Sequence, residues 1–216
     1  MGPSRVPSTE RWRQVVTERG RFIVFEGGEG CGKSTQAARL AEQLGAVLTR
    51  EPGDTAIGAA LRGLLLDPST VMTPVTEALL MAADRAEHVS TVVEPSLSSR
   101  RDVVCDRYVA SSVAYQGHGR GLDVAQILAT SAWATGGLEP DLVLLLEVPA
   151  AVAAARLGRE LDRFEGEGDG FHDRVRAGFR AQADADPRRW AVIDGAASVD
   201  DVAARVADAV ADRLRP

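Results

Sequence analysis

The sequence lacks the features of a disulfide-stabilised, exported or membrane-spanning protein. Its 216 residues contain only two cysteines, Cys31 and Cys105, too few for a disulfide framework or a cysteine-rich metal site. The longest wholly apolar runs, such as Leu142 to Leu146, are far shorter than the roughly 20 residues that a transmembrane helix needs. The first residues also lack the apolar core of a secretory signal. We therefore expect a cytoplasmic protein with no membrane segment.

Aromatic residues are scarce, and acidic residues outnumber basic ones. Aromatic side chains make up 5% of the sequence and hydrophobic ones 45%, which suits one globular domain with a sizeable core. The formal net charge of -6 argues against a broad cationic surface for nucleic acid, so any phosphate site must be local. We predict a single domain over residues 21–216. An N-terminal extension, residues 1–20, precedes it and contains nothing that indicates chemistry.

Lysine is almost absent, since Lys33 is the single lysine in a chain whose lysines and arginines together number 25. It lies in the segment Gly27-Gly-Glu-Gly-Cys-Gly-Lys-Ser34, which fits the P-loop pattern G-x-x-x-x-G-K-[ST] at every fixed position. A predicted buried strand, residues 21–26, precedes this segment, and a predicted helix, residues 33–44, follows it, as the motif requires. The sequence therefore predicts a site for nucleotide phosphates.

Each part of this motif has a physical role at such a site. Its glycines let successive backbone N–H groups face the phosphates, and the N-terminus of the following helix adds partial positive charge. We predict that Lys33 reaches the β- and γ-phosphates of ATP, that Ser34 binds Mg²⁺, and that Thr35 touches the α-phosphate. The predicted ATP-binding residues are Gly27, Gly28, Glu29, Gly30, Cys31, Gly32, Lys33, Ser34 and Thr35.

Apolar strand candidates alternate with helical stretches along the rest of the chain. After residues 21–26, the further predicted strands are residues 46–49, 102–105, 141–148 and 190–193. This alternation predicts a three-layer α/β/α fold with a five-stranded parallel sheet and a functional site at the carboxyl ends of its strands. A segment rich in glycine and charge, residues 162–170, is equally compatible with a mobile lid and with an ordinary solvated loop.

The strand predicted at residues 102–105 leads into residues suited to the acceptor side of a phosphoryl transfer. Asp106 is placed to bind the metal, and the planar guanidinium of Arg107 to bind two phosphate oxygens at once. Glu147 closes a rival strand, but we favour Asp106 for the metal. The Asn-Lys-x-Asp motif of switch GTPases and the Leu-Ser-Gly-Gly-Gln signature of transporter ATPases are both absent from the sequence. These absences favour a kinase.

Four motifs of this sequence resemble those of the bacterial thymidylate kinases. They are the P-loop within Glu26–Thr35, the segment Thr49–Thr55, the segment Cys105–Gly117, and a lid of about residues 156–172 centred on Arg159–Arg163. The third is the most specific, and the resemblance runs from about residue 21 to the C-terminus. It implies the fold of the nucleoside monophosphate kinases, transfer of the γ-phosphoryl group of ATP to dTMP, and a homodimer.

The same resemblance implies roles for individual residues. It places Arg50, Glu51 and Arg107 at the dTMP phosphate, Glu29 at the deoxyribose 3′-hydroxyl, Tyr115 against a ribose 2′-hydroxyl, and Met81, Arg85, Ser112 and Gln116 at the base. The family takes a catalytic arginine from the P-loop or from the lid, and Gly30 stands at the P-loop position, so Arg159 and Arg163 are the candidates. They join Lys33 and Arg107 as the predicted catalytic residues.

Two positions depart from the family pattern and leave an alternative open. Met81 stands where the family usually has a phenylalanine that stacks on thymine, and Asp54 replaces the second glycine of Arg-Glu-Pro-Gly-Gly-Thr. The change at the base keeps open another nucleoside monophosphate or deoxynucleoside kinase, and a non-catalytic nucleotide switch is a further alternative. His88 and His118 have no evident partner in the sequence, so we interpret both as structural or surface groups.

Overall fold

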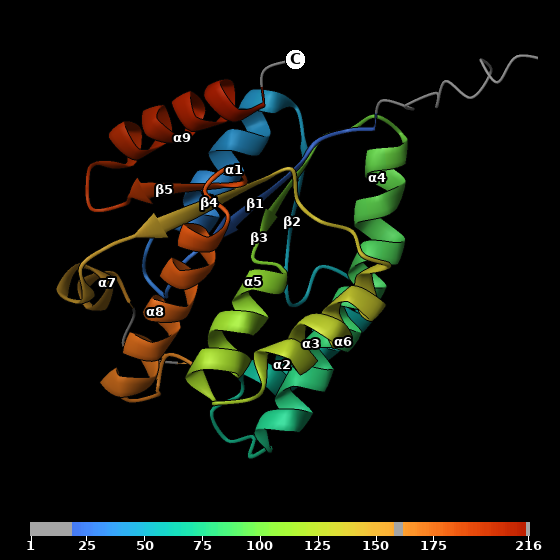
Figure 1. Ribbon diagram of the computed structural model, residues 1–216, viewed down its shortest axis with the longest axis vertical. Coiled ribbons are helices and arrows are strands. Elements are labelled where there is room, and N and C mark those ends of the chain that lie inside the picture. The colour runs from blue at the N-terminus through green and yellow to red at the C-terminus, as the bar shows by residue number, and fades with distance from the viewer. Residues whose placement is uncertain (1–18, 158–161, 215–216) are drawn as a thin grey trace, which may run out of the picture.

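A five-stranded parallel sheet forms the centre of the protein (Figure 1). The computed structural model describes residues 19–157 and 162–214. The strands lie in the order β2-β3-β1-β4-β5, and every pairing is parallel. Their bounds are β1 (Phe22–Glu26), β2 (Val47–Arg50), β3 (Val103–Asp106), β4 (Leu142–Glu147) and β5 (Trp190–Asp194). The five predicted strands are confirmed, with each end within one residue of its predicted position.

Side chains of the strands point alternately to the two faces of the sheet, and hydrophobic clusters lie on both faces. Ile23 and Phe25 of β1 lie in the core shared with α1 (Lys33–Leu44) and α9 (Val199–Arg213). Phe22 and Val24 lie in a core on the opposite face. A strand covered on both faces has no polar side, which is why the inner strands β1 and β4 are nearly continuous apolar runs. The predicted three-layer α/β/α fold is confirmed.

The helices of the second face form two groups (Figure 1). In one, α5 (Val109–Ser112) continues into the π-helical segment η2 (Val113–Gly119), which packs on α8 (Asp169–Ala185). In the other, α3 (Pro74–His88) continues through the π-helical segment η1 (Val89–Val93) into α4 (Glu94–Ser98). The remaining helices are α2 (Ala56–Leu66), α6 (Val124–Thr135) and α7 (Ala150–Arg156). Both α2 and α6 pack against α3.

Capping residues explain where several helices begin and end. The side chains of Thr55 and Ser198 accept hydrogen bonds from backbone N–H groups in the first turns of α2 and α9. Gly45, with a φ of 63°, closes α1 by donating its N–H to carbonyl groups of the last turn. The helix predicted at residues 33–44 is confirmed with the same bounds.

Two predicted segments lie partly outside the described residues. Of the predicted extension, residues 1–20, only Arg19 and Gly20 are described, and Arg19 forms an ion pair with Asp141. Residues 158–161 of the predicted lid are not described, and from Asp169 onward that segment is the first turn of α8. None of the helices within the described ranges is long and apolar enough to cross a bilayer.

Candidate active site

The P-loop joins the end of β1 to the start of α1. Gly27, Gly30 and Gly32 have φ angles of 140°, 68° and 94°, which residues with a Cβ atom rarely adopt. The Lys33 ammonium donates a 2.7 Å hydrogen bond to the carbonyl oxygen of Gly28, and Lys33 is only 6% exposed. All the predicted ATP-binding residues therefore lie in one glycine-rich loop and the first turn of α1, an arrangement that suits phosphates.

The two predicted metal-binding residues lie side by side at the carboxyl edge of the sheet. Ser34 Oγ donates a 2.5 Å hydrogen bond to Asp106 Oδ2. Among the described residues, Asp106 Oδ1 has no hydrogen-bond partner although it is buried. A hydroxyl and a free carboxylate oxygen fit Mg²⁺, which keeps most of its ligands as water and phosphate oxygens. The rival acid, Glu147, forms an ion pair with Arg180 instead.

Arg107 links the P-loop to the acceptor side of the site. Its Nη1 donates to the carbonyl oxygen of Gly27 at 3.0 Å and to Ser111 Oγ at 3.1 Å. Its Nη2 donates to Glu29 Oε1 at 2.6 Å. Burial lowers the pKa of Arg107, but the adjacent Glu29 carboxylate and Tyr115 more than compensate and raise that pKa well above its ordinary value. The structure thus holds a permanent cation next to the phosphate loop.

A cavity of about 90 Å³ opens beside Arg107. Its lining includes these predicted substrate-binding residues: Glu29, Glu51, Met81, Arg85, Arg107, Ser112, Tyr115 and Gln116. Of the predicted set, Arg50 is not among the described residues that line this cavity. Its side chain is exposed at the end of β2, opposite Asp106 in the sheet. The structure therefore brings the predicted substrate-binding residues other than Arg50 together in one pocket.

Glu29 is the acid that faces both cations of the site. Tyr115 donates its phenolic O–H to Glu29 Oε1 at 2.8 Å, beside the bond from Arg107. Burial alone would raise the pKa of Glu29, but the positive charges of Arg107 and Lys33, together with these hydrogen bonds, lower it to about 2. Glu29 is thus ionised and can accept a hydrogen bond from a sugar hydroxyl.

Arg85 lines the cavity and is only 2% exposed. Its Nε donates to Glu51 Oε2 at 2.7 Å. Its two terminal nitrogens reach Ser112 Oγ at 3.2 Å, and Nη2 also donates to the carbonyl oxygen of Tyr108. A buried guanidinium with fixed partners is suited to reading a carbonyl oxygen of a ligand.

Comparison with known proteins agrees with this geometry. The family model described as thymidylate kinase matches residues 25–206. The chain belongs to the thymidylate kinase family. A thymidylate kinase of Gloeobacter violaceus is 50% identical over 198 residues, covering 88% of this chain and 93% of that protein. One from a Synechococcus strain is 50% identical over 200 residues, covering 89% and 96%. The crystal structure of a thymidylate kinase from Ehrlichia chaffeensis superposes with a TM-score of 0.74 at 32% identity, covering 89% of this chain and 99% of that one.

Two residues of this thymidylate kinase family member escaped the sequence analysis. Arg62 of α2 lines the cavity beside Arg107 and donates to the carbonyl oxygen of Pro52 at 2.7 Å. Burial, followed by the nearby charge of Arg50, lowers the pKa of Arg62. In the sequence, Arg62 is one polar position in an apolar helix, and only the packing of α2 brings it to the site. No local pattern distinguishes it from a surface arginine.

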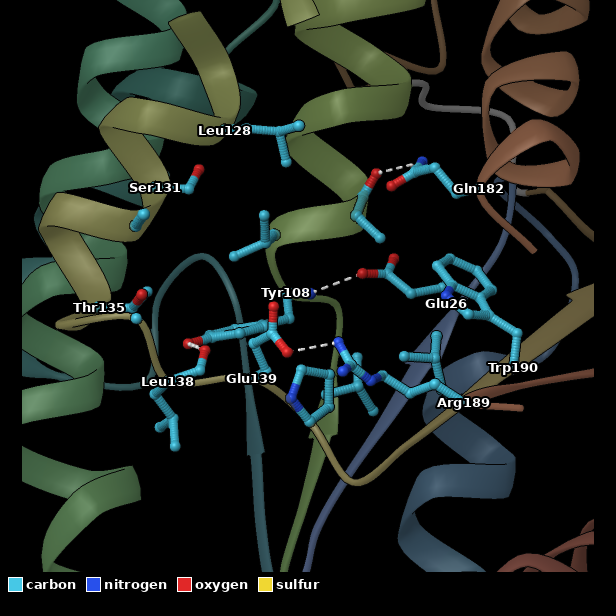
Figure 2. Close-up of a pocket in the computed structure, with 17 residues that line it drawn as sticks. Glu26, Tyr108, Leu128, Ser131, Thr135, Leu138, Glu139, Gln182, Arg189 and Trp190 are labelled. Carbon is cyan, nitrogen blue, oxygen red and sulfur yellow. Dashed lines mark hydrogen bonds and ion pairs between the residues drawn. The ribbon is translucent and has the colours of Figure 1, made fainter. Parts of the chain in front are cut away.

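Glu26 is the second such residue, and it closes β1 directly before the P-loop. It accepts hydrogen bonds from Tyr108 N at 2.9 Å and from Ser111 Oγ at 2.6 Å, so it holds the turn that carries Arg107. Figure 2 shows Glu26 and Tyr108 in the wall of a second cavity, which has a volume of about 220 Å³. Burial raises the pKa of Glu26 to about 7, against the opposing effect of these hydrogen bonds and of Arg107.

Of the two predicted catalytic arginines of the lid, Arg159 lies outside the described residues, and Arg163 is held by groups of α2 and α3 rather than by the P-loop. Arg163 donates to Glu77 Oε2 at 2.7 Å and to the carbonyl oxygen of Leu65 at 2.8 Å. At Gly30, an added Cβ would lie 2.6 Å from the carbonyl oxygen of Ala153 in α7, so a larger side chain does not fit there. The P-loop of this family member has no room for an arginine at that position.

Proposed function

We propose that the protein is an ATP-dependent dTMP kinase, which transfers the γ-phosphoryl group of ATP to dTMP and releases dTDP and ADP. The observation that carries this proposal is the hydrogen bond from Arg107 Nη1 to the carbonyl oxygen of Gly27. It makes the donor-phosphate loop and the acceptor pocket neighbours, so two anionic substrates can be held end to end. Membership of the thymidylate kinase family supports dTMP as the acceptor.

Electrostatics accounts for most of the proposed catalysis. The acceptor is already an anion and needs no strong general base, so the site has to position two phosphates and screen their repulsion. Lys33 binds the β- and γ-phosphates, and Arg107 and Arg50 bind the dTMP phosphate. Ser34 and Asp106 hold Mg²⁺, which when bound neutralises charge on the transferring group.

The remaining site residues select the acceptor. Glu29 binds the 3′-hydroxyl, and Tyr115, directly beside it, leaves no room for a ribose 2′-hydroxyl. Arg85 and Ser112 bind the base in the cavity, and Gln116 lies beside them with Glu51 behind Arg85. Met81 covers the base with a flexible thioether in place of an aromatic ring.

The lid supplies a catalytic arginine in this proposal, and Arg159 and Arg163 are the candidates. Arg163 is bound to Glu77 in the structure, so a catalytic role requires it to exchange that ion pair for a phosphate. Arg159→Ala and Arg163→Ala, made separately, identify the residue: the one that acts should lower kcat by roughly 10³-fold with little effect on the KM for dTMP.

The test is ADP release from ATP and Mg²⁺ with dTMP, run beside dUMP, dGMP, CMP, AMP and thymidine. A strong preference for dTMP is expected, and Lys33→Ala should abolish turnover with every acceptor. Equal rates with the other monophosphates would leave a P-loop kinase but remove the assignment to dTMP. ADP release that needs no acceptor would instead favour a nucleotide switch.

We also propose that the protein is a homodimer formed through α2, α3 and α6. Ten large apolar side chains are exposed in the described residues, and six of them lie on these helices: Ile57, Leu64, Val75, Leu79, Leu128 and Trp133. Both α2 and α6 pack against α3, so these side chains lie on neighbouring helices, and exposed apolar side chains gathered in this way favour an interface. Light scattering should give the mass of a dimer, which Leu79→Glu should convert to a monomer, whereas Val199→Glu, on α9, should not. A monomeric unmodified protein would contradict this proposal.

The proposal places the protein in the cytoplasm, with a small-molecule substrate and neither nucleic acid nor membrane as partner. Both cysteines, Cys31 and Cys105, are free and buried, which suits a reducing compartment. Cell fractionation followed by the dTMP assay tests the location, and activity confined to a membrane pellet would contradict it.

A further inference from the structure

We propose that His88 is a positioning residue for base recognition: it fixes Glu51, and Glu51 in turn orients Arg85 toward the base. This inference rests on the proposed dTMP kinase activity and adds a specificity determinant to it. The sequence alone indicates a structural or surface role for His88, because its partners Glu51 and Thr49 are distant in the sequence.

His88 is fully buried and bound on both sides. Its Nδ1 lies 2.9 Å from Glu51 Oε1, and its Nε2 lies 2.6 Å from Thr49 Oγ1. Thr49 Oγ1 also donates a 2.6 Å hydrogen bond to the exposed Asp54. A continuous chain of contacts therefore runs from the surface acid Asp54 to Glu51. Asp54, which departs from the family pattern, has its carboxylate engaged by Thr49.

The ion pair between Glu51 and Arg85 gives the direction of the contact with His88. Arg85 is a permanent cation, and Glu51 is its carboxylate counter-ion. A carboxylate only accepts hydrogen bonds, so His88 Nδ1 donates to Glu51 Oε1.

The two oxygens of Glu51 are divided between two donors. Oε1 accepts from His88 and Oε2 from Arg85 Nε, so His88 fixes the rotation of the carboxylate that holds Arg85. Asp84 does not take this role: its Oδ1 accepts from Gly53 N, and burial, then the nearby Glu51, raises its pKa to about 6. With Nε held by Glu51, the terminal nitrogens of Arg85 donate to Ser112 Oγ and to the carbonyl oxygen of Tyr108, and Arg85 is among the residues that line the cavity.

The orientation of the Arg85 guanidinium matters for recognition of the chemical group at position 4 of the base. Thymine presents a carbonyl acceptor there and cytosine an amino donor. A fixed guanidinium donates a hydrogen bond to the carbonyl group of thymine. With cytosine, the same N–H donor faces the donor of the amino group, and a polar site strongly rejects a base that leaves two donors opposed. A guanidinium free to turn away discriminates less. The ratio of kcat/KM for dTMP to that for dCMP therefore reports the orientation of Arg85, and a purely structural role of His88 would not change it.

A matched pair of substitutions provides the test. In His88→Asn the amide nitrogen takes the place of Nδ1 and can still donate to Glu51, whereas in His88→Gln it takes the place of Nε2 and cannot. We expect His88→Gln to lower the dTMP to dCMP ratio by roughly tenfold or more, mainly through the KM for dTMP. His88→Asn should keep most of the ratio, and the KM for ATP should be unchanged in both.

Equal ratios in the unmodified protein and in His88→Gln, or equal losses in the two variants, would overturn the inference. An unmodified protein that phosphorylates dCMP as fast as dTMP would instead overturn the proposed function, a result distinguishable before any variant is made. A crystal structure of the unmodified protein with dTMP provides a second test that needs no folded variant. Contacts of Glu51 to both His88 and Arg85, with Arg85 on O4 of thymine, are expected, and Glu51 turned away from His88 would overturn the inference.

Discussion

Arg107 Nη2 and Glu29 Oε1 lie 2.6 Å apart, in an ion pair that joins the turn after β3 to the P-loop. The two side chains are 15% and 23% exposed, so water screens the pair only partly. Any phosphate that enters the acceptor pocket meets an arginine that is already held in place. The pocket is therefore organised before the substrate binds, and the direction in which Arg107 can donate a hydrogen bond to the substrate is fixed.

Arg107→Lys tests whether this fixed fork is needed. Lysine keeps the charge but has three donors on one nitrogen, fewer than the four partners that the guanidinium of Arg107 holds, so kcat/KM for dTMP should fall by roughly 10²-fold or more. The KM for ATP should change little. Steady-state kinetics with each substrate varied in turn measures both, and an unchanged kcat/KM for dTMP would show that charge alone is sufficient.

Asp106→Asn tests the metal site. The amide keeps an oxygen but loses the negative charge, so the Mg²⁺ concentration for half-maximal activity should rise roughly tenfold or more. A titration of activity against free Mg²⁺ at saturating ATP and dTMP measures it. Glu147→Gln is the matched control, because Glu147 is bound to Arg180, and its Mg²⁺ requirement should not change. Equal shifts in both variants would argue against Asp106.

Gly30→Ala tests the close approach of the P-loop to α7. Its Cβ would lie 2.6 Å from the carbonyl oxygen of Ala153, at a φ of 68°, so we expect a loss of roughly 1 to 3 kcal/mol in unfolding free energy. Gly28→Ala is the control, since its Cβ meets no described atom within 4 Å, and it should change stability by less than about 0.5 kcal/mol. Chemical denaturation of both variants measures the difference. Equal stability of the two would refute the steric argument.

Glu26 should make stability depend on pH. Burial raises its pKa in the folded state from 4.5 to about 7, so the folded protein holds this proton more tightly than the unfolded chain does. The contribution of Glu26 to stability is therefore fully present below pH 4.5 and is lost as the pH rises through about 7, by an amount on the order of 3 kcal/mol.

Glu26→Gln removes this titration and isolates it from that of other groups. Unfolding free energies of the two proteins should converge or cross between pH 5 and pH 8, with the unmodified protein losing stability relative to the variant as the pH rises. Lys33 and Arg107 are the cations that oppose the shift. A difference between the two proteins that is constant across this range would contradict the assignment to Glu26.

The fold and most of the pocket could be predicted because their signals are local. The buried strands are continuous apolar runs, the P-loop carries its glycines in a fixed spacing, and the segment from Cys105 to Gly117 is a single stretch. These patterns were sufficient to predict that Lys33, Ser34 and Asp106 lie at one edge of the sheet. Only the strand ends differ, by one residue, because an end depends on the partner strand.

Residues whose role depends on a distant partner could not be predicted in this way. His88 reaches Glu51 and Thr49, and Glu26 reaches Ser111, across long stretches of sequence, and no spacing rule connects such pairs. Arg163 shows the converse. A local motif predicted its place in the lid, but it did not predict the ion pair of Arg163 with Glu77. Motif analysis finds groups that touch substrate more readily than the groups that hold them in place.

The burial of Lys33 gives this chain an unusual reactivity toward acylating reagents. The sequence offers no other lysine side chain, and this one is 6% exposed and bonded to the carbonyl oxygen of Gly28. Apart from the terminal amine, an amine-reactive dye can therefore label the folded protein only by entering the P-loop, while the unfolded chain exposes Lys33 freely. The extent of labelling becomes a direct readout of nucleotide occupancy and of unfolding, with no engineered probe.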